Sequence, residues 1–288
     1  MKWKADNEFV KVNGRTLYRN DMRVLGYTAT GVTFRFKGKK ASAVLLSDVE
    51  GRTQDSLAWM AVFVNDQTTP AKRFPLKEAE AEYTLYESDQ EAEVTITLMK
   101  YSEVEYAKCL IKEIITDSDT LLAPPQQKKR KMLIIGDSIT CGFGVEGDVE
   151  DEIFCTAKEN PSKAYSLLTA QELEAEYQIV AWNGKGVISA YIGEEGDEPD
   201  PQWRLPFLYD YTDGGSEQDY YKKEEKDWEK WNHQSYQADI VTVYLGTNDA
   251  SYTREIPQRD QEFIDAYKLF LGRIHQTQPQ AAILCMLG

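Results

Sequence analysis

The sequence lacks any long apolar run, and it lacks an excess of positive charge. No stretch approaches the roughly 18 to 20 apolar residues that a membrane span needs. Acidic residues outnumber basic ones by 48 to 33, which gives a net charge of −15 and a pI near 4.7. Nucleic acid and anionic membrane surfaces would repel such a chain, so we expect neither as a partner, whereas a neutral carbohydrate is compatible with this charge.

Cysteine is also scarce, and the N-terminus lacks an apolar segment. The chain has only four cysteines, scattered with no CxxC pair or metal-ligand spacing, at Cys109, Cys141, Cys155 and Cys285. Reduced thiols are the simplest interpretation. The opening residues MKWKADNEFVKVNG contain no signal-peptide core. We therefore expect a cytoplasmic protein, or a secreted one if a leader has been removed.

The first part of the chain has the pattern of antiparallel strands. In GVTFRFKG, Val32, Phe34 and Phe36 alternate with polar residues, and the runs SAVLLSD, AEYTLYE and EVTITLMK follow at short intervals. Alternation with a period of two predicts an antiparallel β-sandwich over residues 1–118. The run Ala61–Val64 is continuously apolar, which indicates a strand buried on both faces.

A change of composition predicts a linker at residues 119–131. This segment carries Pro124-Pro125 and two glutamines, and ends in the basic residues 128–131. Such residues are typical of a connector, and four cations on an acidic protein are more often solvated than part of a nucleic-acid patch.

From residue 132 to residue 288 the pattern changes to alternating strands and helices. Four short, continuously apolar runs predict parallel strands, at 132–136, 178–182, 239–245 and 281–287. Periodic segments at 162–176 and 261–275 predict helices between them. The charged run 216–230 predicts a further, solvated helix. This order indicates a parallel α/β sheet, whose ligand site lies beyond the carboxyl ends of the strands.

Polar residues follow three of these strands. Gly136-Asp137-Ser138 follows the first, glycines 184 and 186 follow the second, and Gly-Thr-Asn-Asp at 246–249 follows the third. Acyl transfer needs a hydroxyl nucleophile and preorganised N–H donors for an oxyanion, and these residue types supply both. Each motif alone could instead be a turn or a helix cap. Their joint occurrence at three strand ends favours a site.

These motifs resemble those of the SGNH (GDSL-type) hydrolases. GDSIT at 136–140 is similar to the block that carries the nucleophile, and GTND at 246–249 is similar to the block with the oxyanion asparagine. The resemblance implies that Ser138 is the nucleophile and that the oxyanion is bound by Ser138 N–H, Gly186 N–H (alternatively Gly184) and Asn248. It also implies that Asp137 is structural, ordering the turn, and that no metal or other cofactor takes part.

The details look most like carbohydrate esterase family two, the two-domain acetyl xylan esterases. GDSITCGFG and the stretch LPFLYDYT, followed by a tryptophan-rich segment, are similar to that family. The resemblance implies a jelly-roll domain before a three-layer, flavodoxin-like hydrolase domain. It further implies an acetylated saccharide as substrate, with removal of O-acetyl groups from xylan or related saccharides.

The chain departs from the family in its histidines. The family's base is a histidine near the C-terminus, whereas this sequence has only His233 and His275. His275 falls late in a predicted helix, where a surface role is favoured. His233 precedes the third parallel strand, toward the opposite edge of the sheet. We therefore expect the base to be a histidine beyond Gly288, in a longer protein.

The aromatic segment 194–237 is the candidate substrate surface. Aromatic faces can stack on sugar rings, and Trp203 and Trp228 are the first candidates, although packing against the sheet would also explain such residues. Two alternatives to a saccharide deacetylase stay open. One is a lipase-like esterase acting on small acyl esters, which the lack of an apolar lid disfavours. The other is a carbohydrate-binding relative that has lost its base.

Overall fold

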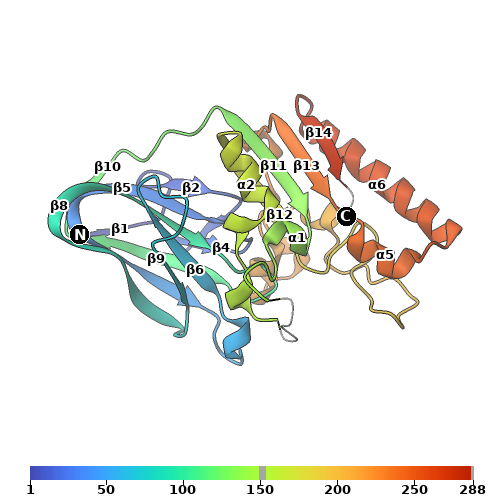
Figure 1. Cartoon of the computed structure of the whole chain (residues 1–288), viewed down its shortest axis with the longest axis horizontal. Helices are drawn as coiled ribbons and strands as arrows, with labels where there is room; N and C mark the ends of the chain where they lie inside the picture. Colours follow the sequence, from blue (N-terminus) through green and yellow to red (C-terminus); the bar gives the residue numbers. More distant parts are fainter. Residues whose placement is uncertain (149–153, 287–288) are drawn as a thin grey trace.

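The computed structural model describes residues 1–148 and 154–286. The described chain contains two sheets, and the second follows the first in the sequence (Figure 1). The N-terminal sheet occupies one end of the molecule. The parallel sheet, with helices on its faces, occupies the other. No helix in these residue ranges is long and apolar enough to cross a membrane.

All strand pairs of the N-terminal sheet are antiparallel, as the alternating pattern predicts. Among the described residues the sheet contains ten strands, hydrogen-bonded into one curled sheet. They are β1 (Lys2–Trp3), β2 (Lys11–Asn13), β3 (Leu17–Arg19), β4 (Met22–Leu25), β5 (Gly31–Ser47), β6 (Trp59–Val64), β7 (Lys72–Pro75), β8 (Glu80–Lys100), β9 (Cys109–Thr116) and β10 (Leu121–Leu122).

Two of these strands are much longer than the sequence predicts. The runs GVTFRFKG and SAVLLSD join into the single 17-residue strand β5, and AEYTLYE and EVTITLMK join into the 21-residue strand β8. The pairing of β5 with β8 shifts register between Gly38 and Lys40 and again between Ala41 and Ser42. Bulges of this kind bend a strand without ending it, so a polar break in the pattern does not mark a turn here.

The core of this sheet follows the alternation in the sequence. Val32, Phe34 and Phe36 are fully buried in one apolar cluster. In β6 the residues 60–63 are all buried, which confirms the prediction of a strand covered on both faces for Ala61–Phe63, whereas Val64 is only partly buried. Strand β10 lies within the segment predicted as the linker and pairs with β5. The limits of the two domains and of the linker stay a prediction.

The second sheet is parallel, in the order β12-β11-β13-β14. Its strands are β11 (Arg130–Gly136), β12 (Ala175–Ala181), β13 (Ile240–Tyr244) and β14 (Ala282–Met286), close to the predicted runs, although residue 287 of the last run lies outside the described residues. The helices are α1 (Ser138–Cys141), α2 (Tyr165–Glu172), α3 (Leu205–Leu208), α4 (Gly214–Asp219), α5 (Thr247–Thr253) and α6 (Pro257–Thr277). Short 3₁₀ turns lie at η1 (Gln54–Ser56), η2 (Thr156–Lys158), η3 (Pro161–Lys163), η4 (Glu225–Asp227) and η5 (His233–Ser235).

Strand β11 is buried on both faces, which explains its continuous apolar sequence. Met132 and Ile134 pack toward α2 and the N-terminal sheet, while Leu133 and Ile135 pack toward α6. The helices therefore cover both faces of the parallel sheet, and the predicted fold class is confirmed. Because one apolar cluster contains Phe63 and Tyr101 together with Met132 and Ile134, the two sheets share a packed interface.

Two helix predictions are wrong in their extent. The segment predicted as a helix over 162–176 is helical only over Tyr165–Glu172, because Glu174 takes a left-handed backbone conformation (φ 49°) and β12 begins at Ala175. The charged run 216–230 is not one solvated helix. It divides into the end of α4 and the short turn η4, since Lys222 also has positive φ (53°) and Trp228 is buried.

Candidate active site

Three strand ends meet at one edge of the parallel sheet. Gly136, the last residue of β11, pairs with Ala181 of β12 on one side and with Tyr244 of β13 on the other. The residues that follow these three strands are therefore neighbours in space, as the sequence predicts.

Asp137 and Ser138 form the turn after β11. Asp137 is the N-cap of α1, and its Oδ1 accepts a hydrogen bond of 3.1 Å from Ile139 N–H. Ser138 is the first residue of α1 and is partly exposed. Within the described part of the chain its hydroxyl makes no hydrogen bond. A Cβ at residue 136 would collide with the Thr140 hydroxyl, so only glycine allows this tight turn.

Asn248 connects the three strand ends. It lies in the first turn of α5, and its exposed fraction is only 8%. Its Nδ2 donates to Asp137 Oδ2 over 3.2 Å and to the Lys185 carbonyl over 3.1 Å. One side chain after β13 therefore contacts the turn after β11 and the turn after β12.

Gly184 and Gly186 lie in the turn after β12. Gly184 has φ +70°, a conformation that glycine adopts without strain, and its carbonyl accepts from Tyr191 N–H over 2.8 Å. Gly186 is buried, and a Cβ there would collide with the Asp249 carboxylate and the Ser189 carbonyl. Neither glycine N–H donates to another described residue, so both residues remain candidate oxyanion donors.

Asp249 is a site residue to which the sequence assigns no role. Its carboxylate accepts hydrogen bonds from the N–H groups of Val187, Ile188 and Ser189, at distances between 2.7 and 3.0 Å. Burial raises the pKa of Asp249, although these N–H groups oppose the shift. Asp249 thus fixes the segment that follows Gly186. Only the position of Asp249 in the GTND motif hints at such a function.

The carboxyl of Asp137 is held in an environment that disfavours its charge. It is 99% buried, and burial raises its pKa to about 6, although backbone N–H groups oppose the shift. Its two oxygens bond to Ile139 N–H and to Asn248, and no hydrogen bond joins it to the Ser138 hydroxyl among the described residues. These contacts agree with a role in ordering the turn, which stays a prediction.

The two histidines lie away from the rim, by which we mean the edge of the parallel sheet where β11, β12 and β13 end. His233 begins η5, before β13, and its ring is 4.5 Å from the ring of Tyr209. Burial, helped by the charge of Arg15, lowers the pKa of His233 to about 4. His275 is exposed in the last turn of α6. Neither is placed beside Ser138, so a general base is not identified within residues 1–148 and 154–286.

Trp203 and Trp228, the predicted substrate residues, pack against each other. Their rings are parallel, with centroids 5.3 Å apart, and Trp203 also contacts Trp182, which directly follows β12. Trp203 is partly exposed, whereas Trp228 is almost completely buried. Both line a pocket of about 720 Å³, together with Phe207 and Arg204. Burial makes Trp228 first a packing residue, and leaves Trp203 as the better candidate for ligand contact.

Over the residues that the structure describes, no group of three or more His, Cys, Asp or Glu side chains could hold a metal ion.

Two family models match consecutive parts of the chain. Residues 12–125 match the model described as carbohydrate esterase 2 N-terminal. Residues 134–288 match the GDSL-like lipase/acylhydrolase family, and this match covers more than half of the chain.

Proteins similar to this chain include several carbohydrate esterases. An acetylxylan esterase / glucomannan deacetylase of Cellvibrio japonicus is 26% identical over 285 residues, covering 99% of this chain and 72% of the relative. The structure of a family two carbohydrate esterase from Clostridium thermocellum, in complex with cellohexaose, is 25% identical with a TM-score of 0.80, covering 97% of this chain and 77% of that one. An acetyl xylan esterase from the rumen bacterium Butyrivibrio proteoclasticus shares the fold, with a TM-score of 0.84 at 22% identity, covering 100% of this chain and 82% of that one.

Proposed function

Because the chain belongs to the GDSL-like lipase/acylhydrolase family, with a carbohydrate esterase 2 N-terminal region before the matched domain, we propose that it removes O-acetyl groups from xylan or related saccharides. It is a carboxylic ester hydrolase that works through a serine acyl-enzyme. The relatives named as acetylxylan esterases, and the relative bound to cellohexaose, support a saccharide substrate.

In the proposed reaction, the Ser138 oxygen attacks the carbonyl carbon of the acetyl group. The carbonyl oxygen becomes an oxyanion, which accepts hydrogen bonds from Ser138 N–H, from Gly186 N–H (or Gly184 N–H) and from Asn248 Nδ2. The intermediate then breaks the bond to the sugar oxygen, which leaves as an alcohol after it takes a proton. Water hydrolyses the acetyl-serine to acetate and restores Ser138.

Asn248 has a double role in this proposal. Both hydrogens of its amide already have partners, at the long distances of 3.2 Å to Asp137 and 3.1 Å to the Lys185 carbonyl. The bond to Asp137 orients the amide. The bond to Lys185 is the one that the oxyanion shares or replaces as negative charge develops, since a charged acceptor forms the stronger hydrogen bond.

The base that takes the Ser138 proton remains the predicted histidine beyond residue 288. A serine hydroxyl without a base is a poor nucleophile at neutral pH, so the proposed reaction requires such a base. The cytoplasmic location also stays a prediction.

The observation that carries the proposal is that Asn248 donates both to Asp137, which precedes Ser138, and to the Lys185 carbonyl, between Gly184 and Gly186. The test is acetate release from acetylated xylan by the complete protein and by its Ser138→Ala variant. We expect release by the first and none above background by the second. Equal rates would overturn the proposal. Saccharide binding without any release, in both proteins, would instead indicate a binding protein.

A further inference from the structure

A buried carboxyl group of the N-terminal part of the chain reaches the rim. Glu103 lies in the loop between β8 and β9, and its Oε2 accepts a hydrogen bond of 2.6 Å from the backbone N–H of Asn183. Glu103 is fully buried. Asn183 opens the turn after β12 that holds Gly184 and Gly186, so this bond joins the N-terminal sheet to the candidate oxyanion turn.

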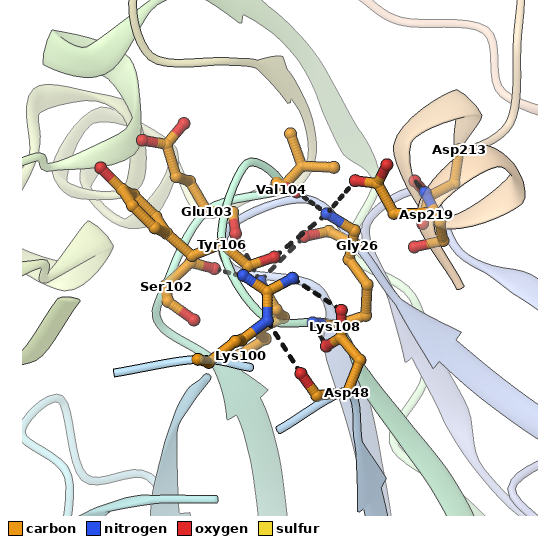
Figure 2. Close-up of polar contacts among 12 residues, drawn as sticks. Gly26, Asp48, Lys100, Ser102, Glu103, Val104, Tyr106, Lys108, Asp213 and Asp219 are labelled. Carbon is orange, nitrogen blue, oxygen red and sulfur yellow. Dashed lines mark hydrogen bonds and ion pairs between the residues drawn. The ribbon is translucent and has the colours of Figure 1, made fainter. Parts of the chain in front are cut away.

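Two buried lysines hold the backbone of the Glu103 loop. Lys100 Nζ donates to the carbonyls of Gly26, Ser102 and Glu103, over 3.0, 2.6 and 2.7 Å. Lys108 Nζ donates to the carbonyls of Val104 and Tyr106 and pairs with Asp219. Figure 2 shows both ammonium groups among these carbonyl groups. These interior hydrogen bonds therefore fix the backbone of the loop, and with it the position from which the Glu103 side chain extends.

A second buried acid accompanies Glu103. Glu159 Oε2 accepts from the backbone N–H of Glu103 over 2.9 Å, so the two acids are neighbours in the interior. Burial raises the pKa of both groups, and the charge of Glu159 adds to the shift at Glu103. The raised pKa values favour the uncharged form of both acids, which explains how they lie together in the interior without full repulsion.

The same carboxyl contacts the helix that carries Ser138. The thiol of Cys141, the last residue of α1, lies 3.8 Å from Glu103 Oε2, within the range of a sulfur hydrogen bond. One oxygen atom of Glu103 thus links the nucleophile helix to the oxyanion turn.

The oxyanion turn is held at both ends by acids. Glu103 binds the N–H of Asn183 before the two glycines, and Asp249 binds the N–H groups of residues 187–189 after them. An oxyanion donor is effective only if it is already in place, and a displacement of about 1 Å can cost about 10² in rate. Loss of either acid would free one end of the turn.

We propose that Glu103, in the N-terminal part of the chain, is a positioning residue of the esterase. It holds the Asn183–Gly186 turn in the place that oxyanion binding next to Ser138 requires. The inference rests on the proposed function, because it assigns that turn to oxyanion binding. The N-terminal sheet then acts on catalysis by bracing the site, without contact with the acetyl group.

The test compares three variants of the complete protein, with kcat and KM measured on an aryl acetate. Glu103→Leu removes the acceptor, and we expect kcat to fall about 100-fold while KM changes less than threefold. Glu103→Gln retains an oxygen that accepts from the Asn183 N–H, and we expect kcat within threefold of the parent. Glu103→Asp retracts the carboxyl by one methylene, and we expect a loss of at least about tenfold.

Tyr177→Phe is the matched control. It removes another hydrogen bond between the two parts of the chain, from Tyr177 Oη to the Ala29 carbonyl over 2.9 Å, near the far end of β12. We expect its kcat to be unchanged. Titration of active sites with a fluorophosphonate corrects every kcat for the folded fraction. If Glu103→Leu does not fold, Glu103→Asp decides the question.

The proposal is overturned if Glu103→Leu (or, where that variant does not fold, Glu103→Asp) keeps kcat within twofold of the parent. It is also overturned if Glu103→Gln loses as much as Glu103→Leu. Failure of the proposed function is distinguishable, because in that case Ser138→Ala would be as active as the parent. The positioning role alone is rejected if the parent is active, Ser138→Ala is inactive and Glu103→Leu is as active as the parent.

Discussion

The amide nitrogen of Asn248 lies 3.2 Å from the carboxylate of Asp137, although 111 residues separate them in the sequence. This bond fixes the relation between the turn that carries Ser138 and the helix that follows β13. Two residues that each look like an ordinary cap in the sequence thereby become parts of one site.

Asn248→Ala tests the oxyanion role of the amide. We expect kcat for acetate release to fall by about 10²–10³, because one preorganised donor is lost at the developing charge. Asn232→Ala is the matched control: Asn232 caps the turn η5 and accepts from Gln234 N–H. Its kcat should be unchanged, and an Asn248→Ala variant with an equally unchanged kcat would contradict the assignment.

Asp137→Asn tests the buried acid through the pH dependence of stability. The pKa of Asp137 rises from 3.8 to about 6 on folding, mainly through burial, so the folded chain binds this proton more tightly than the unfolded chain. The stability that Asp137 contributes is then full below about pH 4 and is lost as the pH rises through 6. We expect the free energy of unfolding of the variant, minus that of the parent, to rise by at most about 3 kcal/mol over this range.

Asp117→Asn provides a control of opposite sign. Although burial opposes it, the N–H groups of Lys39 and Lys40 lower the pKa of Asp117, so its contribution to stability is lost as the pH falls. In urea titrations from pH 3 to pH 7, the variant-minus-parent difference should fall with rising pH for Asp117→Asn. A flat difference for Asp137→Asn would show that its carboxyl does not titrate as described.

Arg15→Met tests how the N-terminal part of the chain holds the aromatic segment. Arg15 is fully buried, and its Nη1 donates to the carbonyls of Tyr209 and Tyr211 over 2.9 and 3.0 Å. Methionine leaves both carbonyls without this donor, and we expect a loss of about 2–4 kcal/mol in the free energy of unfolding.

Lys37→Met is the control for this variant, since Lys37 and Glu91 form an exposed pair at 3.3 Å. Its effect should stay within about 0.5 kcal/mol. Hydrogen exchange should also show faster exchange at residues 209–231 in Arg15→Met. Unchanged exchange there, at unchanged stability, would exclude the anchoring role.

Trp203→Ala tests the predicted saccharide contact. We expect KM for acetylated xylan to rise about 2- to 10-fold, the effect of losing one aromatic contact, while kcat/KM for a small aryl acetate stays constant. Trp3→Ala, a tryptophan that packs on Phe9 in the N-terminal sheet, should leave both values unchanged. Equal losses on the polymer and on the small ester would assign Trp203 to packing alone.

The sequence predicts those features that local patterns encode. Continuous apolar runs identify β11 and β13 because both faces of a parallel strand are covered, and the motifs at their ends place Ser138 and Asn248 on one edge. The division of the charged run 216–230 into short turns was not predictable, because Trp228 is buried by distant aromatic residues that no helical period reveals.

Long-range contacts between polar groups are the part that no local pattern predicts. Glu103 reaches Asn183 across 80 residues, and Arg15 reaches Tyr209 across 194. In the sequence both look like ordinary charged residues of a strand-rich region. Their burial follows only from the packing of the two sheets, which the order of strands and helices does not determine.

The most direct test of the account is the site of covalent labelling by a fluorophosphonate, mapped by peptide mass spectrometry on the protein made from its complete reading frame. The account predicts one adduct per chain, on Ser138, and no adduct in Ser138→Ala. An adduct on another residue, or equal labelling of the two proteins, would contradict it.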